Sequence, residues 1–136
     1  MMGTLDTKGD EYAFLRERVR AAGCDVLVVD CGVRSASPLA DVSADEVAAA
    51  AGEDRAALAV AGDRGPAMAA MTRGATETMR RLHAEGRLDG ILGLGGSGGS
   101  SLISAAMQAL PIGVPKLLVS TMASGDTRPY VGTTDI

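Results

Sequence analysis

Apolar residues follow two patterns that alternate along this chain. Residues 10–22 carry apolar side chains at helical spacing among arginines and glutamates, and Gly23 follows, which predicts an amphipathic helix with a glycine stop. Residues 24–31 contain four consecutive aliphatic side chains at 26–29, which predicts a strand buried on both faces, as in a parallel sheet. Helix and strand therefore follow one another from the start of the chain.

The alternation continues to the end of the sequence. Ser43 and Glu46 form a capping-box pattern, and Pro66 is suited to the first turn of a long helix because its missing N–H needs no partner there. Residues 52–63 show no clear pattern and are treated as irregular. The other predicted elements are a helix from 43 to about 51, a helix over 66–85, a strand over 91–94, a helix over 101–110 and a strand over 116–120.

Repeated strand, loop and helix units predict an α/β fold, specifically a Rossmann-like, doubly wound parallel sheet in three layers. The length of 136 residues is enough for one core, so we expect a single domain over 1–136. Hydrophobic residues make up 46% of the chain but aromatics only 2%, so aliphatic side chains, methionines and alanines must build that core.

Charge and hydropathy exclude several partners. The net charge of -4 argues against long-range attraction to nucleic acid or to an anionic membrane. No apolar run approaches the roughly 20 residues that a membrane span requires, and the first residues lack the apolar segment of a signal peptide. We therefore expect a cytoplasmic protein with no direct nucleic-acid or membrane contact.

A glycine-serine loop between a predicted strand and a predicted helix is the most informative stretch. Glycines let a ligand approach the backbone, and the helix start offers unpaired N–H groups, so the loop is suited to phosphate. The pattern G-x-G-x-x-G lacks the acidic residue that dinucleotide sites need, and no Gly-Lys-Ser/Thr is present. A tight turn packed against a neighbour is the alternative. The candidate phosphate-binding residues are Gly95, Gly96, Ser97, Gly98, Gly99, Ser100 and Ser101.

Two further loops carry residues that can bind phosphate or Mg²⁺. In the first, Thr4 and Thr7 can donate hydrogen bonds, Lys8 can neutralise charge and Asp6 can hold Mg²⁺, although Asp6 or Thr7 could simply cap the first helix. The other loop contains Thr121, Ser124 and Gly125 after the strand over 116–120, and its alternative is a surface turn. Ligands of open α/β sheets bind beyond the carboxyl ends of the strands, so the three loops can converge there.

Arg64 offers a fourth direction of approach to a polyphosphate, but a solvated position at a helix start is the favoured interpretation. The single histidine and two dispersed cysteines give no support for a metal site formed by the protein.

Several motifs, in order over nearly the whole chain, resemble one known family: the ATP-binding domain of the tomato mosaic virus resistance protein and its uncharacterised bacterial relatives. The resemblance implies a Rossmann-like domain that binds ATP with Mg²⁺ through the three loops, followed in longer members by a second α/β domain. The matching motifs are Gly3-Thr4-x-Asp6-Thr7-Lys8, Gly93-Leu94-Gly95-Gly96-Ser97-Gly98-Gly99, Pro111-Ile112-Gly113-x-Pro115-Lys116, Ser120-Thr121-x-Ala123-Ser124-Gly125 and Gly132-Thr133-x-Asp135.

Family members have an apolar strand before the first of these motifs, where this chain has only Met1 and Met2, and relatives continue beyond Ile136. We therefore expect either a fragment that is incomplete at both ends or a misassigned start, with the first strand missing.

The leading functional hypothesis is an ATP-binding module with a regulatory or assembly role, acting as a homo-oligomer or with a protein partner. An ATP-dependent phosphotransferase or ligase with an unknown second substrate is the alternative, in which Asp6 or Asp126 positions Mg²⁺. A domain that serves only as an oligomerisation scaffold is a third possibility.

Overall fold

A computed structural model describes all residues from 1 to 136, and its strands and helices alternate as the sequence predicts. The strands are β1 (Met2–Gly3), β2 (Val29–Asp30), β3 (Ile91–Gly95) and β4 (Lys116–Ser120). The helices are α1 (Leu5–Ala21), α2 (Ala44–Ala50), α3 (Arg55–Ala61), α4 (Arg64–Ala84), α5 (Ser97–Gln108) and α6 (Arg128–Val131).

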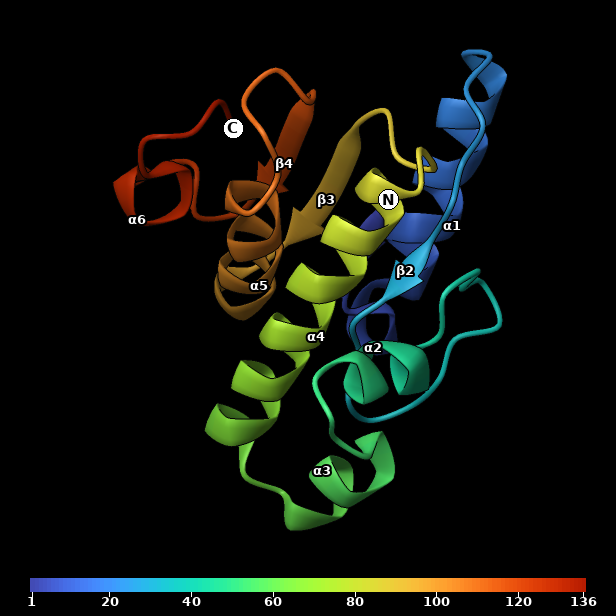
Figure 1. The fold of residues 1–136 in the computed structure, drawn as a ribbon, viewed down its shortest axis with the longest axis vertical. Helices are drawn as coiled ribbons and strands as arrows, with labels where there is room; N and C mark the ends of the chain where they lie inside the picture. Colours follow the sequence, from blue (N-terminus) through green and yellow to red (C-terminus); the bar gives the residue numbers. More distant parts are fainter.

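The four strands form one all-parallel sheet in the order β2-β1-β3-β4. The chain leaves β1 toward β2 and later returns to the other side of β1, so the strand order reverses between β1 and β3. The arrowheads of β2, β3 and β4 point to the same edge of the sheet (Figure 1). This topology confirms the predicted α/β class and is consistent with a Rossmann-like fold.

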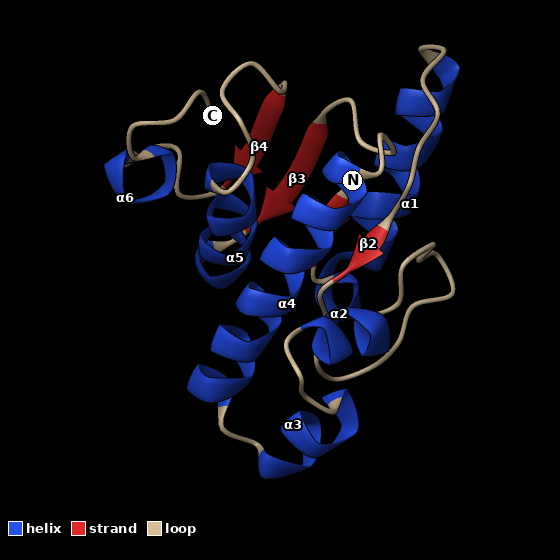
Figure 2. Ribbon diagram, in the orientation of Figure 1, coloured by secondary structure: helices blue, strands red, loops and turns tan.

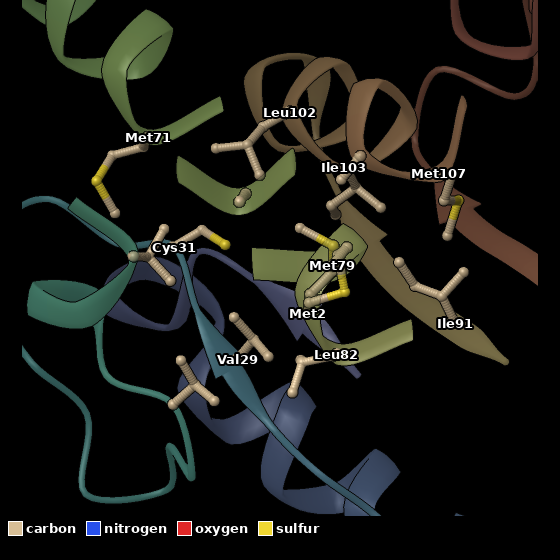
Figure 3. Packing of buried hydrophobic residues seen from close by; sticks show 14 of the residues in the cluster. Met2, Val29, Cys31, Met71, Met79, Leu82, Ile91, Leu102, Ile103 and Met107 are labelled. Carbon is tan, nitrogen blue, oxygen red and sulfur yellow. The ribbon is translucent and has the colours of Figure 1, made fainter. Parts of the chain in front are cut away.

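Helices cover both faces of the sheet. A cluster of 17 buried residues fills the layer between the sheet and α2, α4 and α5, and it includes Met2, Val29, Met79 and Ile103 (Figure 3). On the other face a smaller cluster of Leu5, Tyr12 and Val28 lies under α1. Figure 2 shows α4 and α5 side by side in front of the strands. The core is aliphatic, as the composition predicts.

Strand β1 lies at the centre of the sheet although only two residues form it, so the prediction that the first strand is missing is wrong. Met2 pairs with Val29 on one side and with Gly93 on the other. Beyond Met2 the Tyr12 hydroxyl lies between β1 and β3, where it accepts a hydrogen bond from Leu94 N (2.8 Å) and contacts the carbonyl oxygen of Met2. Burial raises the pKa of this phenol. The side chain therefore separates β1 from β3 at the edge where their loops begin.

Several element boundaries differ from the predictions. Helix α1 begins at Leu5, five residues before the predicted start, with a kink at Lys8 (φ -137°, ψ 28°). Strand β2 contains only Val29 and Asp30 of the predicted 24–31, because β1 offers just two residues for pairing. Helix α5 begins at Ser97 and not at residue 101, so most of the predicted glycine turn is its first turn.

Helix α3 was not predicted, although its caps are visible in the sequence. Asp54 accepts a hydrogen bond from Ala57 N (2.8 Å), and Gly62 ends the helix with a φ of 68°. Helix α4 begins at Arg64 because Asp63 accepts a hydrogen bond from Gly65 N (3.1 Å), which makes Pro66 the third helical residue. The capping box at the start of α2 is confirmed. None of the helices combines the length and apolarity that a membrane crossing requires.

Candidate functional site

A pocket of about 400 Å³ lies at the carboxyl ends of the strands, beside the point where the strand order reverses. Four segments line it: the turn after β1, the loop after β2, the first turn of α5, and the region from α3 to the start of α4. Figure 1 shows α3 and the start of α4 beyond the arrowheads of β2 and β3. Of the predicted site residues, the pocket is lined by Thr4, Asp6, Thr7, Lys8, Gly96, Ser97, Gly98 and Gly99.

The turn after β1 is held by its own hydroxyl groups. Thr7 Oγ1 donates to the carbonyl oxygen of Thr4 (3.1 Å), and the two threonine hydroxyls lie 3.1 Å apart. Lys8 leaves helical geometry at this point, and its Nζ pairs with Glu11 Oε1 at 3.3 Å. The turn thus brings two hydroxyls and one ammonium group to the pocket.

Two carboxylates tie this turn to the loop after β2. Asp6 Oδ2 accepts hydrogen bonds from Val33 N (3.1 Å) and Arg34 N (3.0 Å). The fully buried Asp30 accepts from Leu5 N (3.2 Å), as well as from two backbone N–H groups of its own loop. Burial raises the pKa of Asp30, and these hydrogen bonds oppose the rise. The sequence analysis did not single out Asp30. Its position directly after a run of apolar residues was the signal that could have identified it.

The glycine loop divides into packed and open positions. A Cβ at Gly95 would lie 2.7 Å from Ser100 N, so close packing of α5 on β3 requires glycine there. Gly96 is the N-cap of α5, and a Cβ there would meet nothing closer than Thr121 Oγ1 at 3.8 Å. Gly98 and Gly99 line the pocket, and a Cβ there would make only ordinary contacts, with Arg64 Nη2 at 3.4 Å and Thr4 Oγ1 at 3.8 Å respectively. The backbone at these three positions is therefore accessible to a ligand.

The loop serines have different surroundings. Ser97 is exposed and lines the pocket. Ser100 is buried, with its hydroxyl 3.3 Å from the carbonyl oxygen of Gly95 and 2.6 Å from Ser120 Oγ, and it stabilises the junction of α5 with β3 and β4. Ser101 Oγ donates to the carbonyl oxygen of Ser97 (3.0 Å) on the outer side of α5. Neither Ser100 nor Ser101 lines the pocket.

The third predicted loop lies beside the pocket and does not line it. Thr121 N donates to the carbonyl oxygen of Gly95 (3.2 Å), which places this threonine next to the glycine loop. Ser124 and Gly125 are exposed farther along, and Asp126 pairs with Arg128 at 2.7 Å. The structure thus brings two of the three loops together.

Cationic side chains surround the crevice. Arg64 reaches from α4 across the opening, and its Nη2 lies 3.4 Å from where a Cβ at Gly98 would be. Arg34 lines the pocket from the loop after β2. Neither guanidinium has a hydrogen bond or ion pair within the protein, whereas Lys8 is paired with Glu11. Arg64 is exposed at the start of α4, as the favoured interpretation has it, and its guanidinium also lies beside Gly98 of the glycine loop.

Comparisons with known proteins place the whole chain in one family. The model of the N-terminal domain of the uncharacterised protein family UPF0261 matches residues 1–136. The chain belongs to this family. That match confirms the family membership that the motifs indicated.

The relatives are much longer than this chain. A UPF0261 protein of Clostridium tetani is 45% identical over 137 residues, which cover 100% of this chain and 34% of the relative. The UPF0261 protein RA0729 of Rhizobium meliloti is 46% identical over 136 residues, 100% of this chain and 33% of the relative. The ToMV resistance protein Tm-1(GCR237) of Solanum lycopersicum is 36% identical over 151 residues, 99% of this chain and 20% of that protein. The chain thus spans about a third or less of these relatives.

Proposed function

We propose that this domain binds Mg-ATP, with the polyphosphate on the first turn of α5 and against the turn after β1. The observation that carries the proposal is a pocket lined by Gly96, Gly98 and Gly99, with the unpaired guanidinium of Arg64 beside Gly98. The start of a helix attracts anions through its free N–H groups and its dipole. Lys8 and Arg34 add positive charge to the same pocket of a protein whose net charge is -4.

Mg²⁺ would be held mainly by phosphate oxygens and water, as is usual for this ion in nucleotide sites. Asp6 is the carboxylate beside the phosphate turn, and its Oδ1 has no hydrogen-bond partner in the protein. No group of three or more His, Cys, Asp or Glu side chains gathers as a metal site. The donor set therefore fits an ion that arrives with ATP.

A regulatory or assembly role is favoured over catalysis because of the hydrogen bonds that the pocket carboxylates make. Asp6 holds the loop after β2, and Asp63 caps α4 through Gly65 N. One oxygen of each carboxylate is engaged in a backbone hydrogen bond, and the free oxygen of Asp6 is the one assigned to Mg²⁺, so neither side chain is set up as a general base. The bound nucleotide would then set the affinity for a second copy of the chain or for a protein partner.

Calorimetric titration with Mg-ATP tests the proposal, using two arginine variants on α4. Arg64→Gln removes the guanidinium over Gly98, whereas Arg80→Gln removes an exposed arginine near the other end of the same helix. A charge-assisted hydrogen bond contributes about 1.5 to 3 kcal/mol, so Arg64→Gln should weaken ATP binding about tenfold or more.

Arg80→Gln should leave the affinity unchanged. Absence of Mg-ATP binding to the folded wild-type chain, or equal effects of the two variants, would contradict the proposal. Release of ADP or phosphate in the same samples would favour the phosphotransferase or ligase alternative.

A further inference from the structure

Asp63 is the acidic side chain of the pocket that lies outside both the glycine loop and the turn after β1. The other carboxylate in the lining is Asp6, which belongs to that turn. Only Gly62 and Asp63 separate α3 from α4, and both line the pocket. Gly62 ends α3 with a φ of 68°, and Asp63 begins α4 as its N-cap. A helix on each side therefore fixes the position of this carboxylate.

One oxygen of the Asp63 carboxylate is free. Its Oδ1 accepts the capping hydrogen bond from Gly65 N (3.1 Å), whereas Oδ2 has no hydrogen-bond or ion-pair partner in the protein. An ionised carboxylate accepts hydrogen bonds and donates none. The free oxygen is therefore suited to a ligand group that donates an O–H or N–H hydrogen.

The charge of Asp63 indicates which part of a nucleotide it can contact. Lys8, Arg34 and Arg64 supply the positive charge of the pocket, which attracts phosphate. A carboxylate repels phosphate oxygens, so Asp63 is suited to a neutral part of the ligand. In ATP the neutral donors are the ribose hydroxyls and the amino group of the base.

The position of Asp63 on α4 favours the ribose. Residues four apart on a helix are neighbours, so Arg64 and Met68 form one stripe, and Asp63 and Ala67 form the adjacent one. The stripe of Arg64 and Met68 lies beside the glycine loop, because a Cβ at Gly98 would be 3.4 Å from Arg64 Nη2 and 3.8 Å from Met68 Cε. Asp63 is thus next to the side chains that border the phosphate site. The ribose follows the phosphates directly in a nucleotide, and the base lies farther out.

We infer that the free oxygen of Asp63 accepts a hydrogen bond from the ribose hydroxyls, so that the site selects ribonucleotides. This inference rests on the proposed function. Dinucleotide sites of Rossmann folds use an acidic residue for the ribose hydroxyl, at the end of the strand that follows the glycine loop. The sequence lacks an acidic residue at that place, and Asp63 brings a carboxylate to the crevice from a different element.

The test compares Mg-ATP with its 2′,3′-dideoxy analogue, which lacks both hydroxyls, by calorimetry. Asp63→Ser keeps an N-cap oxygen for Gly65 N and removes the free oxygen, because serine caps a helix as well as aspartate does. Asp54→Ser is the matched control, since Asp54 caps α3 in the same way through Ala57 N and does not line the pocket.

We expect the wild type and Asp54→Ser to bind ATP about threefold to tenfold more tightly than the dideoxy analogue. In Asp63→Ser the two ligands should bind within about twofold of each other. The ratio of the two affinities is the measured quantity, because the loss of a negative charge near the phosphates strengthens the binding of both ligands. Mg-ITP, in which a carbonyl replaces the adenine amino group, should keep the same affinity ratio to ATP in the wild type and in Asp63→Ser.

Equal binding of ATP and the dideoxy analogue to the wild type, or a difference that persists in Asp63→Ser, would overturn the inference and leave the proposed function standing. Loss of the difference in Asp54→Ser would also overturn it, as would an ATP-to-ITP ratio that changes in Asp63→Ser, which would assign the carboxylate to the base. A wild type that binds neither nucleotide would remove the proposed function as well. If Asp63→Ser fails to fold, Asp63→Asn replaces it, because the amide oxygen keeps the cap and the amide nitrogen cannot accept a hydrogen bond. The preference for ATP should again be reduced.

Discussion

The glycines from β3 into α5 form two groups with opposite surroundings. A Cβ at Gly93 would lie 2.4 Å from Ile103 Cγ2, and one at Gly95 would lie 2.7 Å from Ser100 N. Gly98 and Gly99 have no neighbour closer than 3.4 and 3.8 Å. Gly93 and Gly95 let α5 pack tightly on β3, whereas Gly98 and Gly99 leave the surface of the first turn of α5 uncrowded. One glycine-rich stretch thus combines a packing role with an access role.

This difference relates to the two interpretations that the sequence left open. A glycine-rich turn packed against a neighbour describes Gly93 and Gly95, whereas Gly98 and Gly99 line the pocket with the uncrowded backbone that the proposed ligand loop requires. Packed glycines should affect folding when they are replaced, and open glycines should affect binding. The predictions below are ordered by the size of the expected effect.

Gly74→Ala should have the largest effect, on the free energy of unfolding. A Cβ at this position of α4 would lie 1.9 Å from the carbonyl oxygen of Val47 in α2, and backbone cannot move aside as a side-chain tip does. We expect a loss of about 3 kcal/mol or more, measured by denaturant unfolding. Gly9→Ala is the helical control, because nothing lies within 4 Å of its Cβ position, and it should stabilise the chain by up to about 1 kcal/mol. Equal stability of the two variants would contradict the distinction between packed and open glycines.

Gly93→Ala should destabilise the chain by about 1 to 3 kcal/mol through overpacking against Ile103. The double variant with Ile103→Ala tests the cause, since removing Cγ2 makes room for the added methyl. The two changes together should cost less than the sum of their separate effects. Strict additivity in urea unfolding would mean that the contact with Ile103 does not set the cost.

The chain between β2 and β3 marks the limit of what its sequence could predict. Strand β4 has its predicted bounds, and the turn after β3 was identified because it lies between a predicted strand and a predicted helix. The turn after β1 was identified from its threonines, aspartate and lysine ahead of a predicted helix. Strand β1 was missed because two residues carry no periodic pattern and owe their pairing to the strands on both sides. The positions of Arg34 and Arg64 in the pocket depend on how the loop after β2 and the start of α4 come together in the fold, which local patterns do not encode.

Gly98→Val should leave the fold intact and weaken Mg-ATP binding at least about tenfold. The nearest atom to the new side chain is the flexible end of Arg64, so the protein accommodates it while the phosphate site is obstructed. Unchanged ATP affinity of a folded Gly98→Val chain would contradict the role of the open glycines. Gly125→Val sharpens the test, because Gly125 was predicted to belong to the site but does not line the pocket. An equal loss in that variant would assign the third loop to the site as well.

Lys8→Ala should have the smallest effect, and its value lies in the comparison of ATP with AMP. Lys8 lines the pocket opposite the open glycines, and its ammonium group is paired with Glu11 at 3.3 Å. A contact with the β- or γ-phosphate must replace that pair, so the net gain is below the about 1.5 to 3 kcal/mol of an unopposed charge-assisted hydrogen bond. We expect the affinity to fall about threefold to tenfold for ATP and less for AMP, measured by calorimetry.

Glu11→Gln is the complementary variant, because it frees Lys8 and should strengthen ATP binding. Equal losses for ATP and AMP in Lys8→Ala would indicate damage to the turn after β1, and no preference of the wild type for ATP over AMP would mean that Lys8 does not contact the outer phosphates.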